Sequence, residues 1–278
     1  MIDLHTHSTA SDGSLTPQAL ARAGKAAGLT TMALTDHDCA KGLPDFLAAA
    51  REIGLQAIPG IELSAEVPRG QLHLVGLAFD YQNPALCSQF ERLLNGRSER
   101  NEAILAAFHD QGIDLTASEV RAFAGDELIS RVHFALALVK RGIVKDVKDA
   151  FERYLAKGAC CYRNRFRYTP EACIRMVRDA GGLVMMAHPL SLNPNLAELE
   201  GEIAALRDLG LAGMECYYST YDTETTLALL RIAHRLNLVP SVGSDFHGVP
   251  KPNIHLGQLP IPPEAEARLL QALAAAHA

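Results

Sequence analysis

The sequence predicts an α/β fold in which helices alternate with the strands of a sheet or barrel. Short apolar runs alternate with helical segments over most of the chain, and most of these runs are followed by a helix. The length of 278 residues fits one large domain, or one domain with an insertion. Such a chain lies near the size range of a (β/α) barrel.

The predicted elements follow one another regularly, beginning with a strand at Ile2–His7. Thr16 and Pro17 then supply an N-cap and a first-turn proline for a helix that runs to Ala27. The further predicted strands are Thr30–Thr35, Leu55–Leu63, Leu72–Phe79, Leu183–Ala187, Leu211–Tyr217 and Val239–Val242. The helices expected between or after them are Gly42–Ile53, Pro170–Ala180, Leu196–Leu209, Thr223–Leu236 and Pro263–Ala276.

The stretch of residues 83–168 has a different pattern, because helix follows helix without an intervening strand. The helices predicted there are Pro84–Gln111, Ala117–Phe123, Val132–Arg141 and Lys148–Ala156, with a strand only at Ala159–Arg167. We therefore expect residues 1–82 and 169–278 to form a discontinuous catalytic barrel. Residues 83–168 are expected to form an inserted helical cap that contacts substrate, since loops at the carboxyl ends of barrel strands carry function.

The composition excludes several classes of protein. A formal net charge of −6 argues against electrostatic binding of long duplex nucleic acid or of anionic membranes. No apolar run is long enough to span a bilayer, and the first residues do not form a signal peptide. The six cysteines show no disulfide framework, which favours a cytoplasmic protein.

Nine histidine and carboxylate side chains lie in short signatures at or near the ends of the predicted strands. They are His5, His7, Asp12, His37, Glu62, His73, His188, Asp245 and His247. On a strand, residues i and i+2 face the same side, so His5 and His7 can bind one ion together, as can Asp245 and His247. These side chains bind Zn, Mn and Fe. A single buried histidine is more often a hydrogen-bonded core residue, but so many groups at separate strand ends favour a metal centre.

Five motifs that contain these residues resemble, in the same order, the motifs of the PHP (polymerase and histidinol phosphatase) family. They are His5-Thr6-His7-Ser8, Thr35-Asp36-His37-Asp38, Gly60-Ile61-Glu62, Ala187-His188-Pro189 and Gly243-Ser244-Asp245-Phe246-His247. The resemblance covers both halves of the chain. It implies a distorted (β/α)7 barrel of PHP type with a trinuclear centre of divalent ions at the carboxyl ends of the strands.

The resemblance also implies which residues hold each ion. One ion would be bound by His5, His7, Glu62 and Asp245, a second by Glu62, His73 and His188, and a third by Asp12, His37 and His247. Manganese is expected, with iron or zinc as alternatives, and Asp36 is expected to orient ligands. The length and the helical insertion most resemble stand-alone members that act on nucleotides, which include nucleoside 3′,5′-bisphosphate phosphatases and 5′→3′ exoribonucleases.

Such a centre supports hydrolysis of a phosphomonoester by a metal-bound hydroxide, because clustered ions acidify water and neutralise phosphoryl oxygens. The sequence contains no G-x-S-x-G motif, P-loop or G-x-G-x-x-G motif. The expected reaction removes the 3′-phosphate of a nucleoside 3′,5′-bisphosphate, such as adenosine 3′,5′-bisphosphate, and leaves the 5′-monophosphate. Asp245 and His247 are the expected proton carriers at the reacting water.

Recognition of a nucleotide substrate is expected to come mainly from the cap. The candidate contacts there are Arg97, Arg100, Asn101, Ser130, Arg131 and His133, and those in the barrel are Asp12 and His37. Arg131 and His133 open a helix, where anions bind readily, and arginine suits two-pronged contact with phosphate. Arg131 is also expected to assist catalysis. For Arg97 and Arg100 a solvated helix face is an equally good interpretation.

Three alternating arginines, Arg163, Arg165 and Arg167, would make one face of the strand at 159–167 basic. This face could bind a second phosphate or an RNA backbone. It could equally be an exposed edge that discourages aggregation.

The sequence is also compatible with three other functions. A 5′→3′ exoribonuclease acting on short RNA would need an open groove past the ions, and the acidic net charge favours the smaller substrate. A histidinol-phosphate phosphatase is permitted by the family, although the arginines suit a doubly phosphorylated substrate better. A non-catalytic metal-binding module is the fourth possibility.

Overall fold

The protein divides into two compact units in this computed structural model, which describes residues 1–124 and 128–276. Unit 1 comprises Met1–Phe90 and Tyr168–Ala278, and unit 2 comprises Glu91–Arg167. The first boundary between the two units, after Phe90, thus falls inside the long helix Pro84–Asp110, several residues later than the boundary predicted after residue 82.

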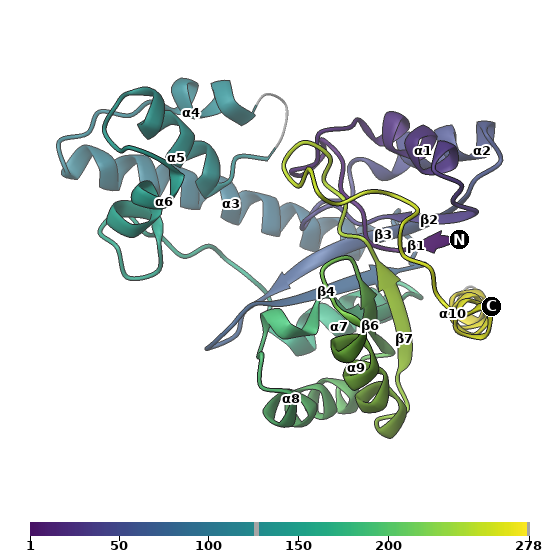
Figure 1. Cartoon of the computed structure of the whole chain (residues 1–278). Helices are drawn as coiled ribbons and strands as arrows, with labels where there is room; N and C mark the ends of the chain where they lie inside the picture. The colour runs from purple at the N-terminus through teal and green to yellow at the C-terminus, as the bar shows by residue number, and fades with distance from the viewer. Residues whose placement is uncertain (125–127, 277–278) are drawn as a thin grey trace. The chain divides into compact units, whose positions relative to one another are not determined.

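Unit 1 is built on a curved sheet whose strands follow the order of the chain (Figure 1). In the described part of the chain its strands are β1 Ile2–Asp3, β2 Thr31–Leu34, β3 Gln56–Ala65, β4 Leu72–Leu77, β5 Leu183–Met186, β6 Gly213–Tyr218 and β7 Val239–Gly243. Neighbouring strands are parallel, except that β4 is antiparallel to both β3 and β5. The connection between β3 and β4 is too short for the crossover that parallel pairing requires.

The sheet closes on itself between the two ends of the chain. The Leu4 amide donates a hydrogen bond to the Val242 carbonyl at 3.1 Å. Thr6 forms a parallel bridge with Phe246 just beyond. The antiparallel β4 and this short seam make the barrel irregular, and the predicted distorted (β/α)7 architecture is confirmed.

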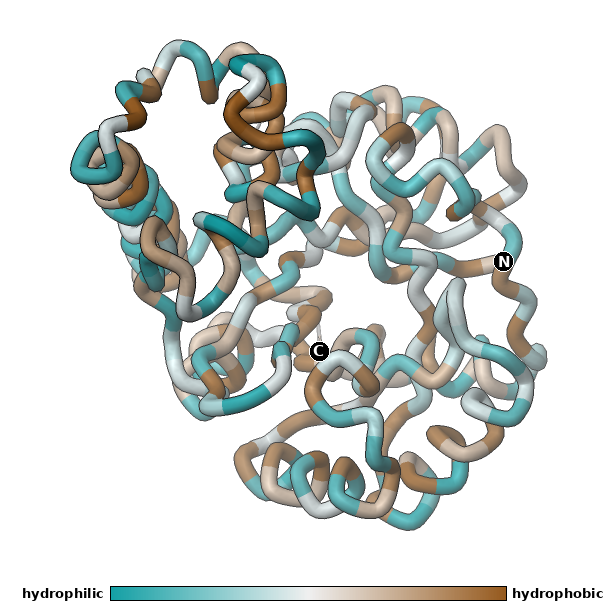
Figure 2. The backbone as a smooth tube through the Cα atoms, turned by 60° about the vertical axis from the view of Figure 1, so that its left-hand side comes forward, coloured by the Kyte–Doolittle hydropathy of each residue, from teal (hydrophilic) through white to brown (hydrophobic). Residues whose placement is uncertain are grey.

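Helices cover the outside of the barrel. They are α1 Pro17–Ala26, α2 Leu43–Glu52, α7 Pro170–Asp179, α8 Leu196–Asp208, α9 Thr223–Arg235 and α10 Pro263–Ala276, with a short η2 at Pro189–Ser191. Several begin where the sequence predicts, because a hydroxyl or carboxylate accepts a free first-turn amide: Thr16 caps α1 and Asp222 caps α9. Hydrophobic and hydrophilic residues are interspersed along the chain in Figure 2. In these helices the apolar residues at helical spacing are the buried ones, such as Leu20 and Gly24 of α1 and Leu229 and Ile232 of α9.

The barrel core consists of aliphatic side chains from most of the strands. Ile2, Ala33, Val75 and Val242 are almost fully buried within one cluster, and Leu269 of α10 packs against them. This apolar layer leaves the polar residues that follow the strands gathered at one end of the barrel.

Unit 2 is helical. It contains most of α3 Pro84–Asp110, followed by α4 Ala117–Ala124, α5 Arg131–Lys140, α6 Val147–Ala150 and a π-helical turn η1 Phe151–Leu155. Phe108 and Phe134 are buried at its centre with ring centroids 6.5 Å apart. Among the described residues of the chain, no helix is both long enough and apolar enough to cross a membrane.

The predicted strand at Ala159–Arg167 is wrong. Residues 162–169 have no regular secondary structure, and no strand pairs with them. Their side chains bond locally instead, as Arg163 donates to the Cys160 carbonyl at 3.0 Å and Arg167 to Asn164 at 2.8 Å. An alternating pattern alone does not form a strand when no neighbouring strand offers its backbone groups.

Replacing Phe108 with alanine should lower the free energy of unfolding by about 3–5 kcal/mol, because it empties the centre of the unit 2 core. Chemical denaturation measures this value. The matched control is Phe123→Ala, which removes a half-buried ring from the edge of the same core. Equal losses in both variants would contradict the placement of Phe108 at the centre.

Candidate metal centre

All nine predicted ligands lie close together at one end of the unit 1 barrel. His5, His7 and Asp12 follow β1, and His37 follows β2. Glu62 lies within β3 and His73 within β4, whereas His188, Asp245 and His247 follow β5 and β7. The carboxyl ends of parallel strands lie at the same end of a barrel, and for this reason residues distant in sequence lie close together there.

Glu62 is the hub of the cluster and is fully buried. Its two oxygens face five imidazole rings, those of His5, His7, His37, His73 and His188. Oε1 is 2.8 Å from His73 Nδ1 and 3.0 Å from His188 Nε2. Oε2 is 3.3 Å from the Nε2 atoms of both His5 and His7 and 2.8 Å from His37 Nδ1.

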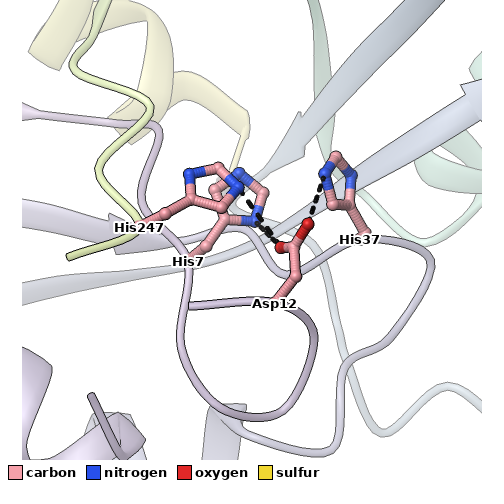
Figure 3. Close-up of side chains that lie close together, drawn as sticks. All are labelled: His7, Asp12, His37 and His247. Atoms are coloured by element: carbon pink, nitrogen blue, oxygen red, sulfur yellow. Dashed lines mark ion pairs between the residues drawn. The ribbon is translucent and has the colours of Figure 1, made fainter. Parts of the chain in front are cut away.

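A second carboxylate, Asp12, stands between three histidines (Figure 3). Its Oδ1 is 3.2 Å from His247 Nε2 and 3.7 Å from His7 Nδ1. Its Oδ2 is 3.6 Å from His37 Nε2. Asp12 is the most exposed member of the cluster, with 38% of its side chain accessible.

Asp245 completes the arrangement from the opposite end of the chain. Its Oδ1 lies 3.3 Å from His7 Nε2 and 3.7 Å from His5 Nε2. Within the described residues, three groups offer ligand atoms that all lie within 4.8 Å of one another. They are His7, Asp12, His37 and His247; His5, His7 and Asp245; and His37, Glu62 and His73. His7 and His37 each belong to two groups, which the sequence did not indicate.

The cluster fits metal ions because it buries polar atoms that the protein itself does not satisfy. His5 Nε2, His7 Nε2 and Glu62 Oε2 are buried and have no hydrogen-bond partner among the described residues. Such atoms are rare in proteins and destabilise the fold. Imidazole nitrogens and carboxylate oxygens that converge in this way suit divalent cations.

Several of these groups hold the protonation state that ligation needs, which is a neutral imidazole or an ionised carboxylate. Burial and the neighbouring His247 and His37 lower the pKa of His7 to about 4. Burial alone would raise the pKa of Glu62, but the surrounding histidines outweigh it and hold that pKa well below its usual value. The pKa of Asp245 is likewise lowered, because His5 and His7 outweigh the effect of burial.

Glu215 of β6 is a member of the site that the sequence analysis missed. Its Oε1 is 2.7 Å from His5 Nδ1, and its Oε2 accepts a hydrogen bond from the His188 backbone amide. A proton on His5 Nδ1 leaves the Nε2 lone pair directed at the centre, as in many metal sites. A Cβ on Gly243 would lie 2.3 Å from Glu215 Oε1, so only glycine fits there. In the sequence, Glu215 is a single acidic residue within an otherwise apolar predicted strand, and this feature could have pointed to it.

Two further carboxylates hold the backbone around the ligands. Asp36 accepts bonds from the Ser8 amide at 2.8 Å and from the Ser11 hydroxyl at 2.5 Å, which shapes the loop that carries Asp12. Asp3 accepts from the His5 and Ser244 amides and so joins the first and last motifs. Tyr218 and Lys251, which the sequence did not indicate, both donate hydrogen bonds to Asp245.

The predicted substrate contacts of the helical insertion all lie in unit 2, and most of them make local bonds there. Arg100 and Asn101 both donate to the Ile129 carbonyl, at 3.3 and 3.4 Å. His133 Nδ1 accepts from the Ser130 amide at 3.1 Å and so caps α5. These bonds fix the turn that precedes α5.

Arg100 lies within a group of arginines. Burial and the neighbouring positive charges lower its pKa to about 9, so it remains protonated at neutral pH. The neighbours are Arg97, Arg165, Arg131 and Arg167. Arg131 donates to the Leu155 carbonyl at 3.1 Å and lies over the rings of Phe151 and Tyr162. We call Arg97, Arg100, Arg131, Arg165 and Arg167 the arginine cluster.

A closing barrel with histidine and carboxylate clusters at one end defines a metal-binding hydrolase, and comparison with known proteins specifies its family. The model of the PHP domain matches residues 3–159. The chain belongs to the PHP domain family.

Several relatives are similar to the chain over most of their length. The chain is 33% identical to a 3′,5′-nucleoside bisphosphate phosphatase of Chromobacterium violaceum, over 97% of this chain and 98% of the relative. It is 34% identical to a 5′-3′ exoribonuclease of Haemophilus influenzae, over 88% and 89%. The solved structure of an amidohydrolase from C. violaceum with bound sulfate superposes with a TM-score of 0.82 at 33% identity, covering 96% of each chain. The prediction of a metal-dependent phosphoesterase is confirmed, which sets aside a non-catalytic module.

Replacing Glu215 with glutamine should weaken metal binding by about 10–100-fold. Glutamine has one acceptor oxygen, whereas Glu215 accepts from both the His5 ring and the His188 amide. Competition with a chromophoric chelator measures the affinity. Glu200→Gln, at an exposed ion pair with Arg235, is the control and should bind metal normally. Unchanged affinity in Glu215→Gln would show that His5 is oriented by other contacts.

Proposed function

We propose that the protein hydrolyses the 3′-phosphate of nucleoside 3′,5′-bisphosphates, such as adenosine 3′,5′-bisphosphate, to give the nucleoside 5′-monophosphate and phosphate. The observation that carries the reaction type is the buried Glu62 carboxylate with five imidazoles around it. The substrate class is supported by the full-length similarity to the bisphosphate phosphatase of C. violaceum.

The proposed centre holds three divalent ions, with manganese as the first candidate and iron or zinc as alternatives. The two oxygens of Glu62 face different histidines, which supports a shared carboxylate. His5, His7 and His37 face Oε2, whereas His73 and His188 face Oε1. Asp245 lies beside His5 and His7. The third ion is assigned to Asp12, His37 and His247, which meet at the most exposed part of the cluster.

The ions, when bound, supply positive charge to the phosphoryl oxygens and acidify water. Water adds its oxygen to phosphorus, and the bond between phosphorus and the 3′-oxygen breaks. Asp245, whose carboxylate is ionised and almost fully buried, accepts the proton of the attacking water on Oδ1 and passes a proton to the departing 3′-oxygen. His247 donates from Nδ1 to the Asp245 carbonyl at 2.8 Å, which keeps its Nε2 directed toward Asp12.

The arginine cluster is proposed to bind the phosphate that is not cleaved. Arg100 is only 7% exposed, and its Nε has no hydrogen-bond partner among the described residues. Neighbouring positive charges disfavour its own charge, so a bound anion would relieve this repulsion. Ser130, Asn101 and His133 shape the adjacent turn, and Arg131 is proposed to stabilise negative charge during the reaction.

A second candidate is a 5′→3′ exoribonuclease that acts on short RNA. The observation in its favour is the 34% identity to the exoribonuclease of H. influenzae. Both reactions use the same centre, and they differ in whether the group released is phosphate or a nucleotide.

Metal-depleted protein reconstituted separately with Mn²⁺, Fe²⁺ and Zn²⁺ should release phosphate from adenosine 3′,5′-bisphosphate. Histidinol phosphate should be a poorer substrate, with kcat/KM lower by about 10²-fold. It lacks the second phosphate, whose charged hydrogen bonds contribute ~1.5–3 kcal/mol each. Phosphate release is measured colorimetrically, and products from short 5′-phosphorylated RNA are separated by size. Turnover of RNA alone would favour the exoribonuclease.

Replacing Arg100 or Arg131 with methionine should raise KM for the bisphosphate by about 10–100-fold. Hydrolysis of para-nitrophenyl phosphate, which has a single phosphate, should be much less affected by Arg100→Met. The matched control in the same unit is Arg141→Gln, whose guanidinium pairs with Glu119. An unchanged KM in both methionine variants would remove the arginine cluster from substrate binding.

A further inference from the structure

Asp245 has two oxygens with separate surroundings. Oδ1 faces His7 and His5, as described above. Oδ2 accepts a hydrogen bond from the Tyr218 hydroxyl at 2.6 Å and is 2.6 Å from the Lys251 ammonium. Two donors at this distance occupy the lone pairs of Oδ2, so Oδ1 is the oxygen left for the centre.

The backbone at Asp245 adds a second observation. Its φ is +57°, a left-handed conformation that costs energy in a residue other than glycine. The Asp245 amide donates to the His5 carbonyl at 2.8 Å, which holds this conformation. The strained backbone and the two donors together determine the direction of the carboxylate.

Lys251 is held in place by its own loop. Its amide donates to the Gly248 carbonyl at 3.0 Å, and the Val249 amide donates to Ser14 Oγ at 2.9 Å. The Ser14 amide in turn donates to the His247 carbonyl at 2.9 Å. The loop after the last motif is thereby tied to the loop that carries Asp12.

Tyr218 approaches Asp245 from β6. Its ring contacts His188 edge-on at 5.7 Å and Tyr221 at 5.0 Å, so the hydroxyl position is fixed by packing. An ionised carboxylate only accepts hydrogen bonds, so the Tyr218 hydroxyl is the donor in its bond with Asp245 Oδ2.

We propose that Tyr218 and Lys251 are positioning residues of the phosphoesterase centre. They clamp Asp245 Oδ2, so that Asp245 acts as a ligand through Oδ1 alone, and Lys251 adds a positive charge at the rim of the site. The inference rests on the proposed role of Asp245 as a metal ligand but not on the identity of the substrate. Without the clamp, both oxygens can bind the ion and the coordination number increases.

The test uses metal-depleted protein loaded with Co²⁺, whose visible absorption falls as the coordination number rises. Tyr218→Phe, Lys251→Met and their double variant should show weaker absorption. They should also show Co²⁺ affinity altered by about 10-fold or more, the size expected for partners that orient a ligand. Lys251→Arg should restore the wild-type spectrum, since arginine can donate to Oδ2.

Two variants serve as controls. Tyr221→Phe removes a neighbouring hydroxyl that accepts a hydrogen bond from the Leu190 amide, and Lys157→Met removes an exposed ammonium in unit 2. Both should keep the wild-type spectrum. Circular dichroism of the metal-free proteins checks that Tyr218→Phe, the more conservative change, is folded.

Wild-type spectra and affinities in Tyr218→Phe and Lys251→Met would overturn the inference. It would also be overturned if these variants bound Co²⁺ normally but lost turnover, since they would then act on the substrate and not through Asp245. Failure of the wild type to cleave bisphosphates would reject the proposed substrate and leave the spectroscopic result standing.

Discussion

The centre depends on one buried carboxylate, Glu62, which is surrounded by imidazole rings on both of its oxygens. An isolated buried carboxylate would be costly, and so would imidazoles that lack partners. Placed together, the imidazoles lower the pKa of the acid. His5 Nε2, His7 Nε2 and Glu62 Oε2 are left without a hydrogen-bond partner among the described residues. The barrel fold brings these groups, which come from five separate chain segments, close together at one end.

Support for this arrangement comes from residues that do not face the ions themselves. Glu215 orients His5 and the backbone of His188, and Asp3 ties the first motif to the last. Asp36 holds the loop that carries Asp12, and Tyr218 and Lys251 hold the Asp245 carboxylate. The segments of His5, Asp12, His188 and Asp245 are therefore each held by a further carboxylate or by a pair of donors, which fixes their geometry before any ion arrives.

The fold class and the nine clustered side chains could be predicted from sequence, because strand periodicity and the position of each residue at or near a strand end are local properties. The role of Glu215 could not, since it depends on the pairing of β6 with neighbouring strands and on the space that Gly243 leaves. The strand predicted at 159–167 was wrong because strand formation also depends on a neighbouring strand. The alternating pattern is present in the sequence, but no strand lies beside this segment to pair with it.

The seam between the two ends of the chain has a consequence for the order of events during synthesis. His5 and His7 leave the ribosome first, whereas Asp245 and His247 follow only after β7 has been made. A nascent chain that ends before β7 cannot close the barrel through Leu4 and Val242. The complete set of nine side chains therefore comes together only after β7 has been made.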